Sequence, residues 1–300
     1  MHKHNIIIIS YMWVPPLCGT GYHTVEINHY MMKKVILITG VSSGFGKQIS
    51  RLLVRAGHIV YRTVRYDPAP GTTEHLLKMD LTNYISIRNT VSTVVQKEGR
   101  IDVLINNAGM HTGGPIETTS TTNIRLQIET NFMGMVNLTR KVLPVMRKQG
   151  GGTIINFSSI GGLIGLPYQA YYSASKFAIE GFSEALRMEV KQFNIKVIVI
   201  NPGDFHTNNT LNRRKFLPRS NEDDPYRDQF LRTLAVIEND ENNGWLPQFL
   251  AKKIIRIIKC KKPKQRYIIA SFDQKLAVAL RYILPASCFR RILENHYRIN

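Results

Sequence analysis

The chain has 300 residues, of which 43% are hydrophobic and 20% charged, and its formal net charge is +19. These values are typical of a globular protein, and the length allows one large α/β domain whose core needs no covalent support. Three scattered cysteines without CxxC spacing, and histidines without HxxxH or HExxH spacing, predict neither a disulfide framework nor a metal site, so a reducing, cytoplasmic setting is expected.

The first 32 residues precede the first convincing strand pattern. A basic His2-Lys3-His4 before Ile6–Ile9 weakly imitates a signal peptide, but the apolar run is short and no clear cleavage site follows it. Met31 and Met32 stand where a natural start would fall. We therefore expect residues 1–32 to be a disordered extension or a start assigned too far upstream. No apolar run along the chain has the length needed to cross a bilayer.

From residue 33 onward, apolar runs suited to buried strands alternate with stretches of helical period. Strands are expected over 35–39, 58–64, 75–79, 101–106, 153–157, 195–200 and 267–270. Helices are expected over 46–56, from a Thr82-Asn83 cap to about 97, over 122–148 with a late interruption at Pro144, over 171–193, and in a basic stretch that ends near Cys260. The alternation predicts a single α/β domain over 33–270, a Rossmann-type doubly wound parallel sheet. A polar stretch, 205–247, follows strand six, where it would cover a substrate.

The C-terminal segment, 271–300, is basic and has apolar residues at helical spacing on both sides of Pro285. Residues 251–300 hold thirteen basic and two acidic residues, which is eleven of the net +19. A basic amphipathic helix can lie on an anionic membrane. The alternatives are a helix that packs on the domain as a lid or partner surface, and a solvated basic tail. No nucleic-acid motif accompanies the charge, so no nucleic-acid partner is expected.

A glycine-rich turn joins the first strand to the first helix, in the sequence Thr39-Gly40-Val41-Ser42-Ser43-Gly44-Phe45-Gly46. The glycines allow a tight turn and a close approach of the backbone to a ligand. The helix that follows offers free N–H groups and the positive end of its dipole to a pyrophosphate. Its place between a strand and a helix is the context that a dinucleotide-binding motif requires.

The end of the second strand indicates which nicotinamide cofactor is bound. NAD binding usually needs an acidic residue there for the ribose 2′-hydroxyl, but Val64 occupies that place and Arg65 follows it. A guanidinium fork suits a 2′-phosphate, and Ser42 and Ser43 leave room beside it. Arg62 is the competing candidate, although strand alternation points it the same way as Val64. NADP is therefore expected.

Tyr172 and Lys176 lie four residues apart on a predicted helix, so they share one face. A phenol with a pKa of about 10 is a poor acid or base near neutrality, and a nearby ammonium lowers that pKa. Tyr171 has Ser175 at the same spacing and no cation. The pattern thus predicts Tyr172, and not Tyr171, as a proton donor.

These motifs together resemble the short-chain dehydrogenase/reductase family over roughly residues 34–270. The resemblance rests on the glycine motif, Asn106-Asn107-Ala108-Gly109, Asn131, a serine thirteen residues before Tyr172, the YxxxK pair, and Asn201-Pro202-Gly203 with Thr207. It selects Ser159 over Ser158 as the hydroxyl that orients the substrate carbonyl. It also implies that Asn131 holds a water molecule that links Lys176 to solvent. It implies a catalytic set of Asn131, Ser159, Tyr172 and Lys176. The cofactor-binding set implied is Gly40, Ser42, Ser43, Gly44, Phe45, Gly46, Arg65, Asp80, Leu81, Asn107, Ala108, Gly109, Tyr172, Lys176, Pro202, Gly203 and Thr207.

Within the family, the apolar stretch 159–167 and the end of the second strand resemble the branch of estradiol 17-beta-dehydrogenase type 1 and the retinol dehydrogenases. The branch implies a lipophilic carbonyl or alcohol substrate, and the family implies a homodimer or homotetramer. The alternative is a non-catalytic NADP-binding regulator or scaffold of the same fold.

Overall fold

The structure, a computed structural model, describes residues 33–69, 71–73, 75–207, 213 and 224–299. The expectation for residues 1–32 therefore lies outside the described residues. So does most of the stretch 208–223, which belongs to the predicted substrate-covering segment. The elements described here all belong to one unit that begins at Lys33.

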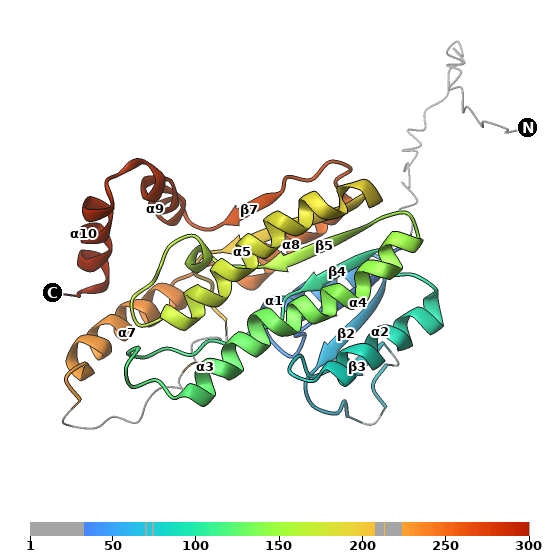
Figure 1. Cartoon of the computed structure of the whole chain (residues 1–300), viewed down its shortest axis with the longest axis horizontal. Helices are drawn as coiled ribbons and strands as arrows, with labels where there is room; N and C mark the ends of the chain where they lie inside the picture. The colour runs from blue at the N-terminus through green and yellow to red at the C-terminus, as the bar shows by residue number, and fades with distance from the viewer. Residues whose placement is uncertain (1–32, 70, 74, 208–212, 214–223, 300) are drawn as a thin grey trace, which may run out of the picture. The chain divides into compact units, whose positions relative to one another are not determined.

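A parallel sheet of seven strands forms the centre of this unit, in the order β3-β2-β1-β4-β5-β6-β7 (Figure 1). The strands are β1 Val35–Thr39, β2 Ile59–Val64, β3 Leu76–Lys78, β4 Val103–Asn106, β5 Gly152–Phe157, β6 Ile195–Pro202 and β7 Arg266–Ile269. Every residue of β1 and β4 is buried, because helices cover both faces of a parallel sheet. Their near-continuous apolar sequences are the reason that the strands could be predicted.

Helices cover both faces of the sheet, and two more helices follow the last strand. They are α1 Gly44–Arg55, α2 Tyr84–Glu98, α3 Thr121–Ile128, α4 Gly134–Lys148, α5 Ala170–Val190, α7 Arg227–Asn242, α8 Pro247–Lys259, α9 Phe272–Ile283 and α10 Ala286–Tyr297. On one face α1 and α8 pack against the strands in one apolar cluster. On the other face α2, α4 and α5 form a second cluster. The doubly wound Rossmann-type fold is thereby confirmed, and the strand order reverses between β1 and β4, where such folds bind ligands.

The helical stretch predicted over 122–148 is interrupted at a different place from the one expected. Helix α4 continues through Pro144 to Lys148, so the interruption predicted at that proline is wrong. The break is a π-helical turn over Glu129–Met133, between α3 and α4. Such a turn inserts one extra residue per turn and is often found at functional sites. Here it carries Asn131.

The C-terminal segment forms two helices, α9 and α10, with Leu284 and Pro285 between them. Helix α9 begins with a capping box, in which Ser271 and Gln274 each bond the backbone of the other. Val278 of α9 and Phe289 of α10 are buried in a third apolar cluster, against the loop after β5. One side of this segment thus packs on the domain, as the packing alternative predicts. Among the described residues, no helix combines the length and the apolar character that a membrane span requires.

Candidate active site

The glycine turn after β1 is pressed against the chain that leaves β4. Gly40 has a φ of +71°, and a Cβ on it would lie 2.7 Å from the Cα of Ala108. A Cβ on Gly46 would lie 2.1 Å from the carbonyl oxygen of Gly40. The side-chain amide of Asn107 donates to the carbonyls of Thr39 and Gly40, at 2.8 and 3.0 Å. No side chain fits at Gly40 or Gly46, so the backbone of the turn packs closely and the N-terminus of α1 remains open to a ligand.

A cavity of about 830 Å³ opens beyond this turn, at the carboxyl ends of the central strands. This volume lies in the upper part of the range for cofactor and small-molecule sites. The predicted residues that line it are Gly40, Ser42, Ser43, Gly44, Phe45, Arg65, Asp80, Leu81, Asn107, Ala108, Gly109, Ser159, Tyr172, Lys176, Pro202, Gly203 and Thr207. Gly46 and Asn131 do not line it and lie behind its wall. A turn that excludes side chains, opening into a cavity of this size, fits a dinucleotide.

The ends of β2 and β3 form one part of the cavity wall, in the half that is expected to bind the cofactor. Arg65 lines the cavity, and its guanidinium lies over the ring of Tyr66, 4.8 Å from the centroid. Arg62 instead turns to Thr73, donating to its hydroxyl at 2.5 Å, and does not line the cavity. Asp80 accepts hydrogen bonds from the backbone and the hydroxyl of Thr82, at 2.9 and 2.8 Å. Of the two arginines, Arg65 is the one placed to meet a ligand.

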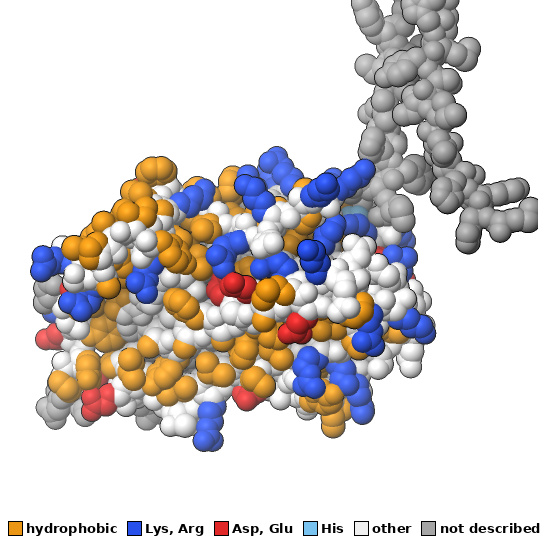
Figure 2. Space-filling view, turned by 45° about the horizontal axis from the view of Figure 1, so that its top comes forward, with side chains coloured by type: hydrophobic (Ala, Val, Ile, Leu, Met, Phe, Trp, Pro, Cys, Tyr) orange, Lys and Arg blue, Asp and Glu red, His pale blue; other side chains and the backbone are white. Residues whose placement is uncertain are grey.

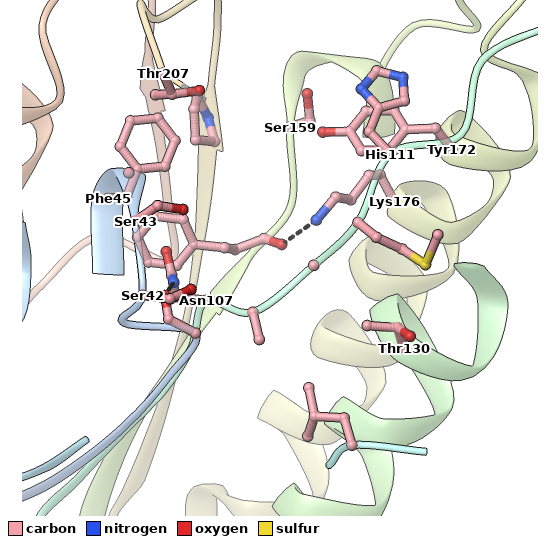
Figure 3. Close-up of a pocket in the computed structure, with 18 of the residues that line it drawn as sticks. Ser42, Ser43, Phe45, Asn107, His111, Thr130, Ser159, Tyr172, Lys176 and Thr207 are labelled. Carbon is pink, nitrogen blue, oxygen red and sulfur yellow. Dashed lines mark hydrogen bonds between the residues drawn. The ribbon is translucent and has the colours of Figure 1, made fainter. Parts of the chain in front are cut away.

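Tyr172 lies on α5, and its hydroxyl points into the cavity beside the hydroxyl of Ser159 (Figure 3). The Ser159 hydroxyl accepts a hydrogen bond from the backbone N–H of Gly161, at 3.1 Å. The imidazole of His111 stacks on the Tyr172 ring, with centroids 4.0 Å apart and planes 15° apart. Burial raises the pKa of Tyr172 above its ordinary value, and the hydrogen bond from Ser159 acts in the opposite direction. In this structure the phenol is held protonated.

The pKa of Tyr172 is raised and not lowered, contrary to the prediction from the Lys176 spacing. Its Nζ donates to the carbonyl oxygen of Phe157 at 2.9 Å (dashed in Figure 3), and lies 5.6 Å from the centroid of the Tyr172 ring. Burial lowers the pKa of Lys176 to about 8, although Glu180 acts to raise it. The spacing of four residues placed the two side chains on one face. It could not show that burial of the phenol, the largest influence on its pKa, raises that pKa.

Asn131 is buried in the π-helical turn and holds the chain that leaves Gly109. Its Oδ1 accepts from the backbone N–H of Met110 at 2.8 Å, and its Nδ2 donates to the carbonyl of Met110 at 2.9 Å. Nδ2 also donates to the hydroxyl of Ser175, at 3.1 Å. Asn131 thus ties the turn between α3 and α4 to the cavity wall and to α5, next to Lys176.

Several cavity residues lie outside the predicted set. His111 follows the Asn-Ala-Gly element by two positions, and nothing in its local sequence signals a stack on Tyr172. Asp204, Glu241 and Tyr297 also line the cavity, from the loop after β6, from α7 and from α10. The carboxylate of Asp204 accepts a hydrogen bond from the Gln274 side chain of α9. Their separation in sequence, from 111 to 297, is why periodicity and motif spacing could not bring them together.

Asp204 makes the stability of the fold depend on pH. Burial, with the charges of Glu241 and Asp240, raises the pKa of its carboxyl to about 7. The folded chain therefore keeps this proton at pH values where the unfolded chain, with a pKa of about 3.9, has released it. Stability from this group is present at low pH and is lost as pH rises through 4 to 7.

We expect Asp204→Asn to remove that loss. At about 1.4 kcal/mol per pKa unit, the variant should unfold with a free energy about 2 to 4 kcal/mol higher than the wild type at pH 8. The difference should shrink at pH 5. Urea unfolding at the two pH values measures it, and a difference independent of pH would contradict this role of Asp204.

Comparison with known proteins identifies the family. The model of the family described as short chain dehydrogenase matches residues 34–217. The chain is 46% identical to a 3-ketodihydrosphingosine reductase of Bacteroides thetaiotaomicron over 270 residues, which are 90% of this chain and all of that protein. It is 32% identical to dehydrogenase/reductase SDR family member 7B of Bos taurus, over 87% of this chain and 81% of that one.

A solved short-chain dehydrogenase from Streptomyces avermitilis has the same architecture, with a TM-score of 0.73 and 30% identity over 89% of this chain and 97% of that chain. The family match and these similarities agree with the glycine turn and the Ser159, Tyr172 and Lys176 geometry. The chain belongs to the short-chain dehydrogenase/reductase family and is an oxidoreductase.

Proposed function

We propose that this protein is an NADP(H)-dependent oxidoreductase that interconverts a carbonyl group and an alcohol on a lipophilic substrate, with Tyr172 as the general acid and base. The observation that carries the proposal is the position of Tyr172 beside Ser159, in a cavity that begins at the glycine turn. In the cofactor half, the turn and the N-terminus of α1 would hold the pyrophosphate. Arg65 would hold the 2′-phosphate.

The chemistry follows from the positions of these side chains. When bound, the reduced nicotinamide supplies the hydride that the carbonyl carbon receives. Ser159 and Tyr172 present two hydroxyls to the carbonyl oxygen, and Tyr172 donates its proton to that oxygen as negative charge develops. The Tyr172 hydroxyl carries its proton at neutral pH, as this step requires. Lys176, held by the carbonyl of Phe157, provides positive charge 5.6 Å from the ring when the phenolate forms.

The substrate half of the cavity supports a lipophilic substrate. Ile160, Leu166, Phe205 and Ile237 line it, from the loops after β5 and β6 and from α7. The relative that is 46% identical over its whole length acts, by its name, on 3-ketodihydrosphingosine, a long-chain ketone. The resemblance to the steroid and retinol branch also implies a bulky lipophilic substrate. We propose a long-chain ketone as the substrate class, since the relative with this name matches 90% of this chain over its own whole length.

A carbonyl panel tests this function. NADPH oxidation should be measured with 3-ketodihydrosphingosine, a long-chain methyl ketone, its four-carbon homologue, estrone and retinal. Because each buried methylene contributes about 0.8 kcal/mol, a long-chain ketone should exceed the four-carbon homologue in kcat/KM by at least about a hundredfold. Equal kcat/KM for the long and the short ketone would contradict the substrate class. NADPH binding without turnover of any carbonyl would favour the non-catalytic regulator.

A further inference from the structure

The outer face of α9 exposes an unusual amount of apolar surface. Among the large hydrophobic side chains of the described residues, the three most exposed all lie on this helix: Phe272 at 76%, Ile283 at 74% and Tyr282 at 72%. Leu276 is exposed by 45%. Soluble proteins rarely leave contiguous apolar patches of this kind without an interaction that uses them.

Three of these residues, together with Ala279, form one stripe along the helix. Phe272, Leu276, Ala279 and Ile283 are separated by four, three and four residues, which places them on one face. Val278 of the same helix points the other way, into the cluster that α9 and α10 form against the domain. Helix α9 is therefore apolar on both sides, and only one side is covered within the described part of the chain.

Basic side chains accompany the stripe on the C-terminal segment. Among residues 271–299, the exposed basic residues are Lys275, Arg281, Arg290, Arg291 and Arg298, and the acidic residues are Asp273 and Glu294. Glu294 is paired with Arg290, at 3.4 Å. Figure 2 shows hydrophobic side chains gathered over α9 and α10, with Lys and Arg side chains beside them. The surface therefore combines an apolar stripe with a net positive charge.

We propose that the outer face of α9, with the basic residues of α10, docks on an anionic lipid bilayer. An apolar stripe that enters the interface, with cations at the level of the headgroups, is the arrangement by which a surface helix binds such a membrane. A second copy of the chain fits this surface less well. A two-fold contact brings the same patch of each subunit together, which would place the basic residues opposite one another.

The inner sides of α9 and α10, opposite the docking surface, lie against the active-site cavity. Gln274 of α9 bonds Asp204 in the cavity wall, and Tyr297 of α10 lines the cavity itself. Ile160 and Leu166 line the cavity and also pack against the cluster formed by α9 and α10. A lipid held in the bilayer would thus meet the protein on the side of α9 and α10, the helices that border the substrate half of the cavity. This step alone rests on the proposed function; docking does not.

Vesicle flotation tests the docking with the full chain and no substrate. The wild type should float with phosphatidylcholine vesicles that contain 30% phosphatidylglycerol, and its bound fraction should fall in 1 M NaCl. With phosphatidylcholine alone it should bind at least tenfold more weakly. Phe272→Glu with Ile283→Glu should lower binding to the anionic vesicles at least tenfold. Turnover of a water-soluble ketone should be unchanged, because neither residue touches the cavity.

The matched control is Val54→Glu with Ile85→Glu, which exchanges two apolar residues, exposed by 49% and 58%, for the same added charge on α1 and α2. The control should float like the wild type. A wild type that does not float, or an α9 variant that floats equally well, would overturn the proposal. So would a wild type that stays unbound but is a dimer that the α9 variant dissociates, since the stripe would then be a subunit interface. Vesicle binding without carbonyl turnover would overturn the proposed function and leave the docking intact.

Discussion

Tyr172→Phe should lower kcat by about a hundred- to ten-thousandfold, the range that a positioned general acid contributes. The substitution removes one hydroxyl from a ring that His111 stacks on at 4.0 Å, so the ring should keep its place. NADPH binding, measured by fluorescence titration, should change little. The loss should therefore appear in kcat with the affinity for NADPH retained.

Tyr171→Phe is the control that the chain offers. Tyr171 is the neighbouring residue on α5, but its hydroxyl donates to the carbonyl of Ile116, at 3.1 Å, and does not line the cavity. The control loses the same group one position away and should keep nearly full activity. Comparable activity in the two variants would contradict the assignment of the proton donor to Tyr172.

Arg65→Asp should reverse the preference between NADPH and NADH. Hydrogen bonds to charged groups contribute about 1.5 to 3 kcal/mol, so loss of the guanidinium should raise KM for NADPH by about 10- to 100-fold. The new carboxylate repels a 2′-phosphate and can accept hydrogen bonds from a free ribose hydroxyl, so KM for NADH should fall or stay unchanged. Initial rates with both cofactors measure the ratio.

Arg62→Gln is the matched control, since Arg62 lies on the same strand but bonds Thr73 and does not line the cavity. It should leave the ratio of the two KM values near that of the wild type. If Arg62→Gln changes the ratio and Arg65→Asp does not, Arg62 is the residue that meets the 2′-phosphate, and our assignment is wrong.

The sequence could predict the fold because its signals are local and agree with one another. The strand expected over 35–39 has those bounds in the structure, and Asn83 caps α2 as predicted. The glycine turn could also be predicted, because only glycine fits where Gly40 meets Ala108. Each of these features depends on residues near one another in sequence or on a backbone that excludes side chains.

What the sequence could not predict depends on contacts between distant segments. The stack of His111 on Tyr172 brings together the loop after β4 and helix α5. The π-helical turn over Glu129–Met133 contains no proline or glycine that could mark it in the sequence. The bonds that Asn131 makes from this turn, to Met110 and Ser175, join segments that are far apart in sequence. The raised pKa of Tyr172 depends on burial, which residue spacing does not reveal.

The most direct test of the central claim is to follow the hydride itself. NADPH carrying deuterium at C4 of the nicotinamide, prepared with the label on either face, should be incubated with the wild type and 3-ketodihydrosphingosine. The product should be analysed by mass spectrometry. We predict that one of the two labelled cofactors yields the alcohol with one deuterium on the former carbonyl carbon, and that Tyr172→Phe yields almost none. A protein that binds NADPH but forms no labelled alcohol, from this ketone or any carbonyl of the panel, would contradict the account.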